Sequence, residues 1–117
     1  MTSLTHLQKA IIKENKNYLK MDIHTKRNLE LTETIRDKAK RGSLIWTLDK
    51  TSTSMGGRLL RKWLESPLID VRQIEFRQNA LGELKDDIVK RNTIKEYMNN
   101  IYDIERLTTK VVYGNIT

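Results

Sequence analysis

The sequence of 117 residues contains no cysteine, two histidines and a single proline. Without cysteine there is no disulfide framework, no thiolate metal site and no cysteine nucleophile. The two histidines, His6 and His24, cannot form a histidine-rich metal cluster, and His24 has no second histidine or carboxylate pair at a metal-ligand spacing. No apolar run is long enough to span a membrane, and Met1 does not begin a signal-peptide pattern. These absences predict a soluble, cytoplasmic protein that holds no metal and no cofactor.

Charge is distributed unevenly along the chain, whose net charge is +7. Residues 1–62 contain 14 Lys and Arg against 6 Asp and Glu, whereas residues 63–117 contain 8 against 9. A basic half raises the expectation of a polyanionic partner, and the residues considered for weak contact with DNA phosphates are Lys38, Lys40 and Arg41. No aromatic residues alternate with them to stack on bases, and a solvated basic surface is the commoner explanation of such a cluster.

The stretch from Thr51 to Asp70 predicts a central helix. Thr53 or Ser54 can cap its start with a hydroxyl group, and Pro67 ends it by moving the preceding residue out of the helical region. Apolar residues recur at helical spacing and form one broad face: Met55, Leu59, Leu60, Trp63 and Leu64. We expect Trp63 to be buried on this face, as the main contact between the two halves of the chain.

Gly56 and Gly57 lie in the first turn of this predicted helix, where glycine costs about 1 kcal/mol relative to alanine. We interpret them as allowing another helix to approach closely. The alternative is a phosphate site at the helix N-terminus. Against that alternative, no apolar strand precedes the glycines and no Gly-Lys-Ser/Thr sequence follows them.

The N-terminal part of the chain predicts a small antiparallel β-sheet. Three short extended runs are expected to form it: Ala10–Lys13, Tyr18–Asp22 and Leu29–Thr32. Asp22 can cap a helical turn over Ile23–Asn28 between the second and third runs. In the third run, Leu29 and Leu31 fall on one face by the period of two. We expect residues 1–36 to form this β-rich subregion.

Residues 43–114 predict a series of helices. Four charges and a glycine in residues 37–42 favour a mobile crossing before them. Capping residues then precede successive apolar stripes: Ser43, Asp70, Asp86 or Asp87, and Asp103. Trp46 lies among aliphatic residues and is expected in the core, and Gly114 is expected to stop the last helix. The predicted fold is mainly α, a helical array attached to the small sheet.

No catalytic constellation is visible in the sequence. Serines and threonines have no histidine placed to activate them. Pairing with basic residues four positions away explains the helical carboxylates Glu65, Glu75, Glu83 and Glu105. Asp103 and Glu105 flank one apolar residue and are not expected to face each other. We therefore expect this chain to have no enzymatic activity.

Five spaced motifs occur in one order between Tyr18 and Gly114. They have the patterns D-x-x-T-x-RNLEL, GSL-x-x-x-LD, T-x-MG-x-RLL-x-x-W-x-x-x-PL, I-x-x-R-x-x-A and D-I-E-R. Together they resemble the signature of the MutS family of DNA mismatch-repair proteins, with Ile104 where leucine is usual. The matched residues taken as a structural signature are Asn28, Glu30, Met55, Gly56, Arg58, Leu59, Trp63, Pro67, Asp103 and Arg106.

The resemblance implies that residues 1–117 are the N-terminal part of the core, or lever, domain of such a protein. Family members bind mismatched double-stranded DNA as dimers through other domains, and they hydrolyse ATP with Mg in a C-terminal ATPase domain. Neither a Walker motif nor a Phe-x-Glu mismatch-reading pattern occurs in this sequence. By resemblance, the segment is a scaffold that couples mismatched DNA to the ATPase domain, with other MutS domains as its partners. The family's long lever helices and clamp would follow Thr117.

The competing hypothesis is a stand-alone basic helical module that binds nucleic acid. Such a module should fold tightly alone and bind DNA with a steep dependence on salt. A lever segment should instead expose apolar faces that other helices cover. The distribution of apolar surface therefore distinguishes the two hypotheses.

Overall fold

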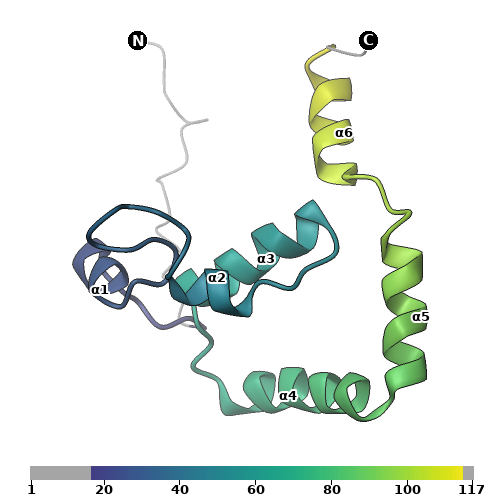
Figure 1. The fold of residues 1–117 in the computed structure, drawn as a ribbon, viewed down its shortest axis with the longest axis horizontal. Helices are drawn as coiled ribbons and strands as arrows, with labels where there is room; N and C mark the ends of the chain where they lie inside the picture. Colours follow the sequence, from purple (N-terminus) through teal and green to yellow (C-terminus); the bar gives the residue numbers. More distant parts are fainter. Residues whose placement is uncertain (1–16, 115–117) are drawn as a thin grey trace, which may run out of the picture.

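Six helices, joined by turns, make up the computed structural model, which describes residues 17–114 (Figure 1). They are α1 (Ile23–Asn28), α2 (Leu44–Leu48), α3 (Ser54–Glu65), α4 (Val71–Asp86), α5 (Ile88–Met98) and α6 (Ile104–Val112). The prediction of a mainly α fold is confirmed. The division into subregions 1–36 and 43–114 stays a prediction.

The predicted antiparallel sheet is wrong for the described residues, which contain one isolated antiparallel bridge, between Tyr18 and Leu68, and no strand. Two backbone hydrogen bonds flank this bridge, from Leu19 N–H to the Pro67 carbonyl at 2.8 Å and from Ile69 N–H to the Asn17 carbonyl at 3.2 Å. The bridge therefore fastens the start of the described chain to the segment after α3. The run Ala10–Lys13 lies outside the described residues.

A left-handed residue explains why Leu29–Thr32 is not a strand. Leu29 ends α1, and Glu30 follows with a φ of 49°, a conformation that turns the chain sharply. The period of two is lost at this turn, so Leu29 is 57% exposed while Leu31 is 7% exposed. A sequence pattern of alternating leucines cannot reveal a turn made by a glutamate.

The small buried core lies where this turn meets α2. Leu31 and Ile45 are the buried hydrophobic residues of the described chain, and Ser43 is buried beside them. The backbone joins the two segments, because Leu44 N–H bonds to the Glu30 carbonyl and Ile45 N–H to the Leu31 carbonyl, both at 2.9 Å. Residues 30–45 thus form one hydrogen-bonded unit.

Residues 37–42 belong to that unit and differ from the crossing that we expected. The Thr34 N–H bonds to the Ala39 carbonyl at 2.9 Å, and the Ser43 hydroxyl donates to the Lys40 carbonyl at 2.5 Å. Gly42 has a φ of 90°, which glycine adopts without strain. Internal hydrogen bonds therefore hold this charged turn in one conformation.

The predicted helix caps are confirmed. Each capping side chain accepts a hydrogen bond from a backbone N–H in the first turn of its helix: Asp22 from Thr25, Ser43 from Trp46, Thr53 from Gly56, Asp70 from Arg72, Asp87 from Lys90 and Asp103 from Arg106. Helix α3 ends at Glu65, two residues before Pro67, as the proline requires. Gly114 follows α6 with a φ of 68°, the left-handed geometry expected of a helix stop.

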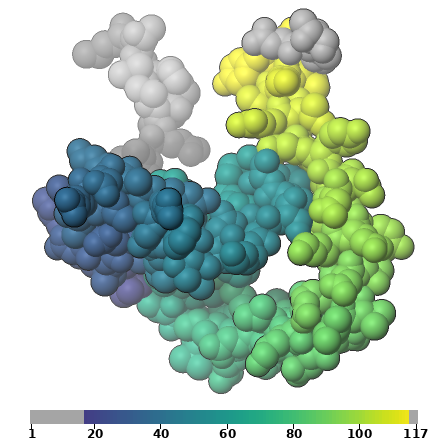
Figure 2. Space-filling model, viewed as in Figure 1, coloured from purple at the N-terminus to yellow at the C-terminus, as the bar shows by residue number. Residues whose placement is uncertain are grey.

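Helices α3 to α6 form an open frame. In Figure 1, α4 runs along the bottom of the view, α5 rises from its end, and α6 stands above α5. Figure 2 shows an opening between α3 and α5 in the same view. Because α3 and α5 do not close over a common core, the apolar faces of these helices remain largely uncovered.

The expectation that both tryptophans are buried is wrong. Trp46 is 49% exposed and Trp63 is 40% exposed. Trp46 lies on α2, which has only five residues and cannot enclose it. Trp63 lies on α3, which α4 contacts from one side only, through Arg77 on the Trp63 ring. The helical spacing identified the apolar face correctly, but a face becomes a core only where another element covers it.

Candidate functional site

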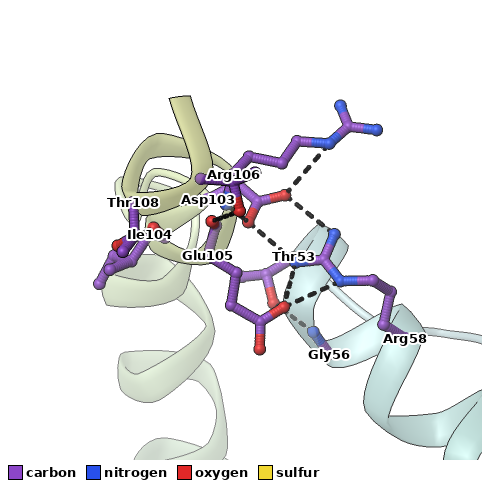
Figure 3. A network of polar contacts seen from close by, with 9 residues as sticks. Thr53, Gly56, Arg58, Asp103, Ile104, Glu105, Arg106 and Thr108 are labelled. Atoms are coloured by element: carbon purple, nitrogen blue, oxygen red, sulfur yellow. Dashed lines mark hydrogen bonds and ion pairs between the residues drawn. The ribbon is translucent and has the colours of Figure 1, made fainter. Parts of the chain in front are cut away.

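A charged network joins α3 to the start of α6 (Figure 3). The Arg58 guanidinium makes a bidentate pair with Asp103, with Nη2 at 2.8 Å from Oδ1 and Nη1 at 3.0 Å from Oδ2. It also donates twice to Glu105 Oε2, from Nη2 at 2.7 Å and from Nε at 3.1 Å. All three guanidinium nitrogens therefore bind carboxylates that lie more than 40 residues away in the sequence.

Local structure brings these three side chains together. Arg58 projects from the second turn of α3, Asp103 is the N-cap of α6, and Glu105 lies in the first turn of α6. The cap residue accepts the Arg106 N–H at 3.2 Å with the same Oδ1 that binds Arg58. An acidic pair at a helix N-terminus is favoured by the helix dipole, so α6 presents negative charge to Arg58.

The network shifts the pKa values of its members. Hydrogen bonds from Arg58 lower the pKa of the Asp103 carboxyl to about 2, and the Arg106 N–H adds to this effect. The same bonds to Asp103 and then Glu105 raise the pKa of Arg58 above its usual value. Both groups therefore stay charged throughout the physiological range.

The expectation that Glu105 pairs within its own helix is wrong, because it pairs with Arg58 of α3. Asp103, which we expected not to face Glu105, binds the same guanidinium. Asp103 is a cap with non-helical backbone, so the helical spacing that separates residues two apart does not apply to it. Glu83 also pairs outside its helix, with Lys90 of α5, whereas Glu65 does pair with Arg61 four positions away at 3.3 Å.

An apolar groove lies along α4 and is bordered by Trp63 of α3 and by the turn that follows α3. Its volume is about 920 Å³, and its walls include Trp63, Ile74, Phe76, Leu81 and Leu84. The Arg77 guanidinium stacks on the Trp63 ring, 3.9 Å from the ring centroid. Phe76 is 76% exposed and Leu81 is 67% exposed. An isolated globular protein rarely leaves so many large apolar side chains uncovered in one place.

The close approach at Gly56 and Gly57 comes from the preceding turn and not from another helix, which corrects our interpretation. A Cβ atom on Gly56 would lie 3.1 Å from Thr53 Oγ1 and 3.5 Å from Thr51 Cβ. A Cβ atom on Gly57 would lie 3.4 Å from Thr51 Oγ1. The glycines therefore make room for the capping turn of their own helix.

The remaining signature residues lie at turns and on helices. Asn28 is the last residue of α1, Glu30 makes the left-handed turn after it, and Pro67 lines the apolar groove. Met55 is half-buried and Leu59 is 47% exposed on α3. Arg106 lies 3.8 Å from Asp103 Oδ2, with its side chain 78% exposed.

The basic residues considered for DNA contact are all exposed, but one of them is already engaged. Lys40 Nζ lies 2.8 Å from Asp49 Oδ2, and this contact, with hydrogen bonds from Thr51, lowers the pKa of Asp49 to about 2. Lys38 has a φ of 49° in the turn, and Arg41 follows Lys40. The structure therefore leaves Lys38 and Arg41 as the more accessible cations of the three.

Residues 17–114 contain no group of three or more His, Asp or Glu side chains placed to hold a metal ion. Within the same residues, no helix has the length and apolar character needed to cross a membrane. The features of this part of the chain are thus the Arg58 network and the exposed apolar groove. Sequence reasoning noted Arg58 and Asp103 separately, and the signal that could have joined them is their opposite charge in two motifs of one signature.

Comparison with known proteins gives consistent matches over nearly the whole chain. The family model described as MutS domain III matches residues 24–117. The chain is 50% identical over 113 residues to the DNA mismatch repair protein MutS of Listeria welshimeri, which covers 97% of this chain and 13% of that protein. The corresponding proteins of Alkaliphilus oremlandii and Bacillus subtilis are 50% identical over 115 residues and 49% identical over 114 residues, and each match also covers 13% of the relative. The chain therefore spans about one eighth of the length of these relatives, and it belongs to the MutS family of DNA mismatch repair proteins, in which its residues 24–117 match domain III.

Proposed function

We propose that this chain is a structural lever segment that couples mismatched-DNA binding to ATP hydrolysis in a longer mismatch-repair protein. The observation that carries the proposal is the uncovered apolar groove along α4 and Trp63, with Phe76 76% exposed and Leu81 67% exposed. Apolar surface of this extent is suited to contact with further helices. The 13% coverage of the relatives supports the same conclusion.

In this proposal, the chemistry belongs to other parts of the longer protein. ATP and Mg bind in an ATPase domain, mismatched double-stranded DNA binds through other domains, and the whole protein acts as a homodimer in the cytoplasm. The segment contributes helices whose relative positions transmit a change from one site to the other. It has no catalytic residue of its own.

The first test compares the apolar groove in two contexts. Acrylamide quenching of Trp63 fluorescence, in a Trp46→Phe background, is measured for the isolated chain and for the full-length protein that contains it. The isolated chain should be readily quenched, because 40% of Trp63 is exposed. In the full-length protein we expect clear protection, and equal quenching in both contexts would refute the lever assignment.

A second test concerns ATP. The described residues contain no phosphate-binding loop motif, so we expect the isolated chain to hydrolyse no ATP. A steady-state assay on purified protein measures this. Turnover that survives repurification and disappears on mutation of a residue in this chain would contradict the proposal.

The competing function, a stand-alone nucleic-acid-binding module, is favoured by the basic N-terminal half. Titrations of matched and mismatched duplexes at low and physiological salt distinguish it, because phosphate contact alone carries no sequence information. We compare a Lys38→Ala, Arg41→Ala variant with a Lys85→Ala, Lys95→Ala control that loses the same charge. For a lever segment, both variants should weaken an already weak attraction equally. For a binding module, the Lys38 and Arg41 variant should lose far more affinity, with a salt slope reduced by about two.

A further inference from the structure

Helix α6 is held in place by charge and not by apolar packing. Its apolar residues Ile104, Leu107 and Val111 are 60%, 50% and 60% exposed. The polar contacts recorded between α6 and α3 are the four hydrogen bonds from Arg58 to Asp103 and Glu105. Removing these bonds would leave little to fix the position of α6 relative to α3.

The charged network is open to water. The Arg58 side chain is 43% exposed, and the Glu105 side chain is 69% exposed. Interactions between exposed charges weaken as ions screen them, with a Debye length that falls from about 30 Å at 0.01 M to about 3 Å at 1 M salt. Ionic conditions or a competing charged group can therefore break the network.

Local contacts that do not involve Arg58 support the helical conformation of α6. Asp103 caps its N-terminus, the hydroxyls of Thr108 and Thr109 bond to backbone carbonyls one turn earlier, and Gly114 ends it. The connector from α5, residues 99–103, is non-helical, and its Tyr102 is 79% exposed. A short exposed connector between two helices is a suitable hinge.

Asp103 has a second partner for the detached state. The Arg106 Nε lies 3.8 Å from Asp103 Oδ2 within the same helix, and its side chain is 78% exposed. When Arg58 leaves, Arg106 can approach the same carboxylate without any movement of the backbone. Asp103 thus has a second cationic partner within α6, which remains beside the carboxylate when Arg58 leaves.

From this geometry we propose that Arg58, Asp103 and Glu105 form an electrostatic latch that switches α6 between a position fixed on α3 and a position swung away from it. In the closed state the latch carboxylates bind Arg58. In the open state Asp103 pairs with Arg106, and α6 moves about the connector at residues 99–103. The latch is a property of this chain, and it does not depend on the proposed lever function.

The absence of cysteine allows a direct test, since two introduced cysteines are the sole labelling sites. Spin labels are placed at Lys62→Cys on α3 and Val112→Cys on α6, both exposed positions outside the latch. Double electron–electron resonance then measures the distance between the two helices. For the latched chain at low salt, one dominant distance is expected, and raising the salt to about 1 M should shift and broaden it.

Three variants test the latch residues. Arg58→Ala should reduce the population at the latched distance by roughly two- to fivefold, a typical range for surface ion pairs, and should abolish the salt dependence. The combined Asp103→Asn, Glu105→Gln variant should do the same, because asparagine retains the cap. The matched control Arg61→Ala removes an arginine from the same helix whose partner is in α3 itself, and it should leave the distance unchanged.

Circular dichroism accompanies each distance measurement to confirm that the helices remain. If Arg58→Ala loses helix content, the test of the latch is the dependence of the distance on salt in the labelled chain without further substitution. A distance distribution unaffected by both salt and Arg58→Ala would overturn the latch. Arg106→Gln should raise the salt concentration needed to open the latch, and an unchanged midpoint would refute the exchange of partners at Asp103.

Discussion

Replacing Trp63 with alanine measures how much stability the α3–α4 contact supplies. Trp63 is 40% exposed, so about three fifths of its surface is covered. A tryptophan side chain can bury up to about 250 Å², which gives roughly 150 Å² here and an upper bound of about 4 kcal/mol at about 25 cal/mol per Å². Compactness of the unfolded chain reduces such values by about 10–40%, and alanine retains part of the contact, which leaves about 2–3 kcal/mol. This value is below the about 3–5 kcal/mol expected for a fully buried tryptophan.

Urea melts followed by circular dichroism measure the loss for Trp63→Ala and for two companions. Arg77→Ala removes the cation stacked on the ring and should cost about 0.5–1 kcal/mol. The control Arg61→Ala, on an exposed part of α3, should change the free energy of unfolding by less than about 0.5 kcal/mol. If Trp63→Ala has the same urea midpoint as the parent, α4 does not stabilise α3, and the apolar groove is only a surface feature. A loss above about 5 kcal/mol would instead mean that Trp63 is buried in solution.

Two further predictions follow from backbone geometry and charge. Gly42→Ala should destabilise the chain by about 1–2 kcal/mol, because the φ of Gly42 is 90° and the new Cβ would lie 3.3 Å from Thr34 Cγ2. Gly82→Ala should instead stabilise the chain by about 0.5–1 kcal/mol, because Gly82 lies within α4 and its new Cβ would meet no other atom. Thermal melts of the two variants should therefore move in opposite directions, and a shared direction would contradict the assigned geometry. The Asp103 carboxyl should titrate by NMR near pH 2, and Arg58→Ala should return its pKa towards 3.8. Because folding lowers the pKa of Asp103, the stability that this carboxylate contributes is complete above pH 3.8 and is lost as the pH falls through about 2. If Asp103 titrates identically in Arg58→Ala and in the parent, this prediction is contradicted.

Much of the helical half was predictable because its signals are local. A cap side chain bonds to an N–H two or three residues ahead, so Thr53 and Asp103 could be identified without any tertiary information. The same holds for Pro67 and Gly114, which act through their own backbone preferences. Local signals of this kind gave the helix positions in the described chain and the mainly α class.

The failures occurred where a non-local partner or an unusual backbone decided the outcome. The alternation of Leu29 and Leu31 favoured a strand, but the left-handed Glu30 between them placed one outside and one in the core. An apolar stripe predicted a buried Trp63, yet burial depends on which elements lie opposite, and α4 covers only one side. The carboxylates that bind Arg58 could not be assigned from helical spacing, since their partner lies in another helix.

Asp87 has a consequence for insertions and deletions in the chain. This one residue is both the last cap of α4 and the first cap of α5, so the two helices meet without a loop. Each residue of an α-helix advances the direction of its side chains by about 100° and its axis by about 1.5 Å. One residue added inside α4 would therefore rotate α5, with no flexible segment at Asp87 to absorb the change. The first non-helical segment after this junction is the connector at residues 99–103, so the contact between α6 and Arg58 can survive such an insertion only if that connector changes its conformation.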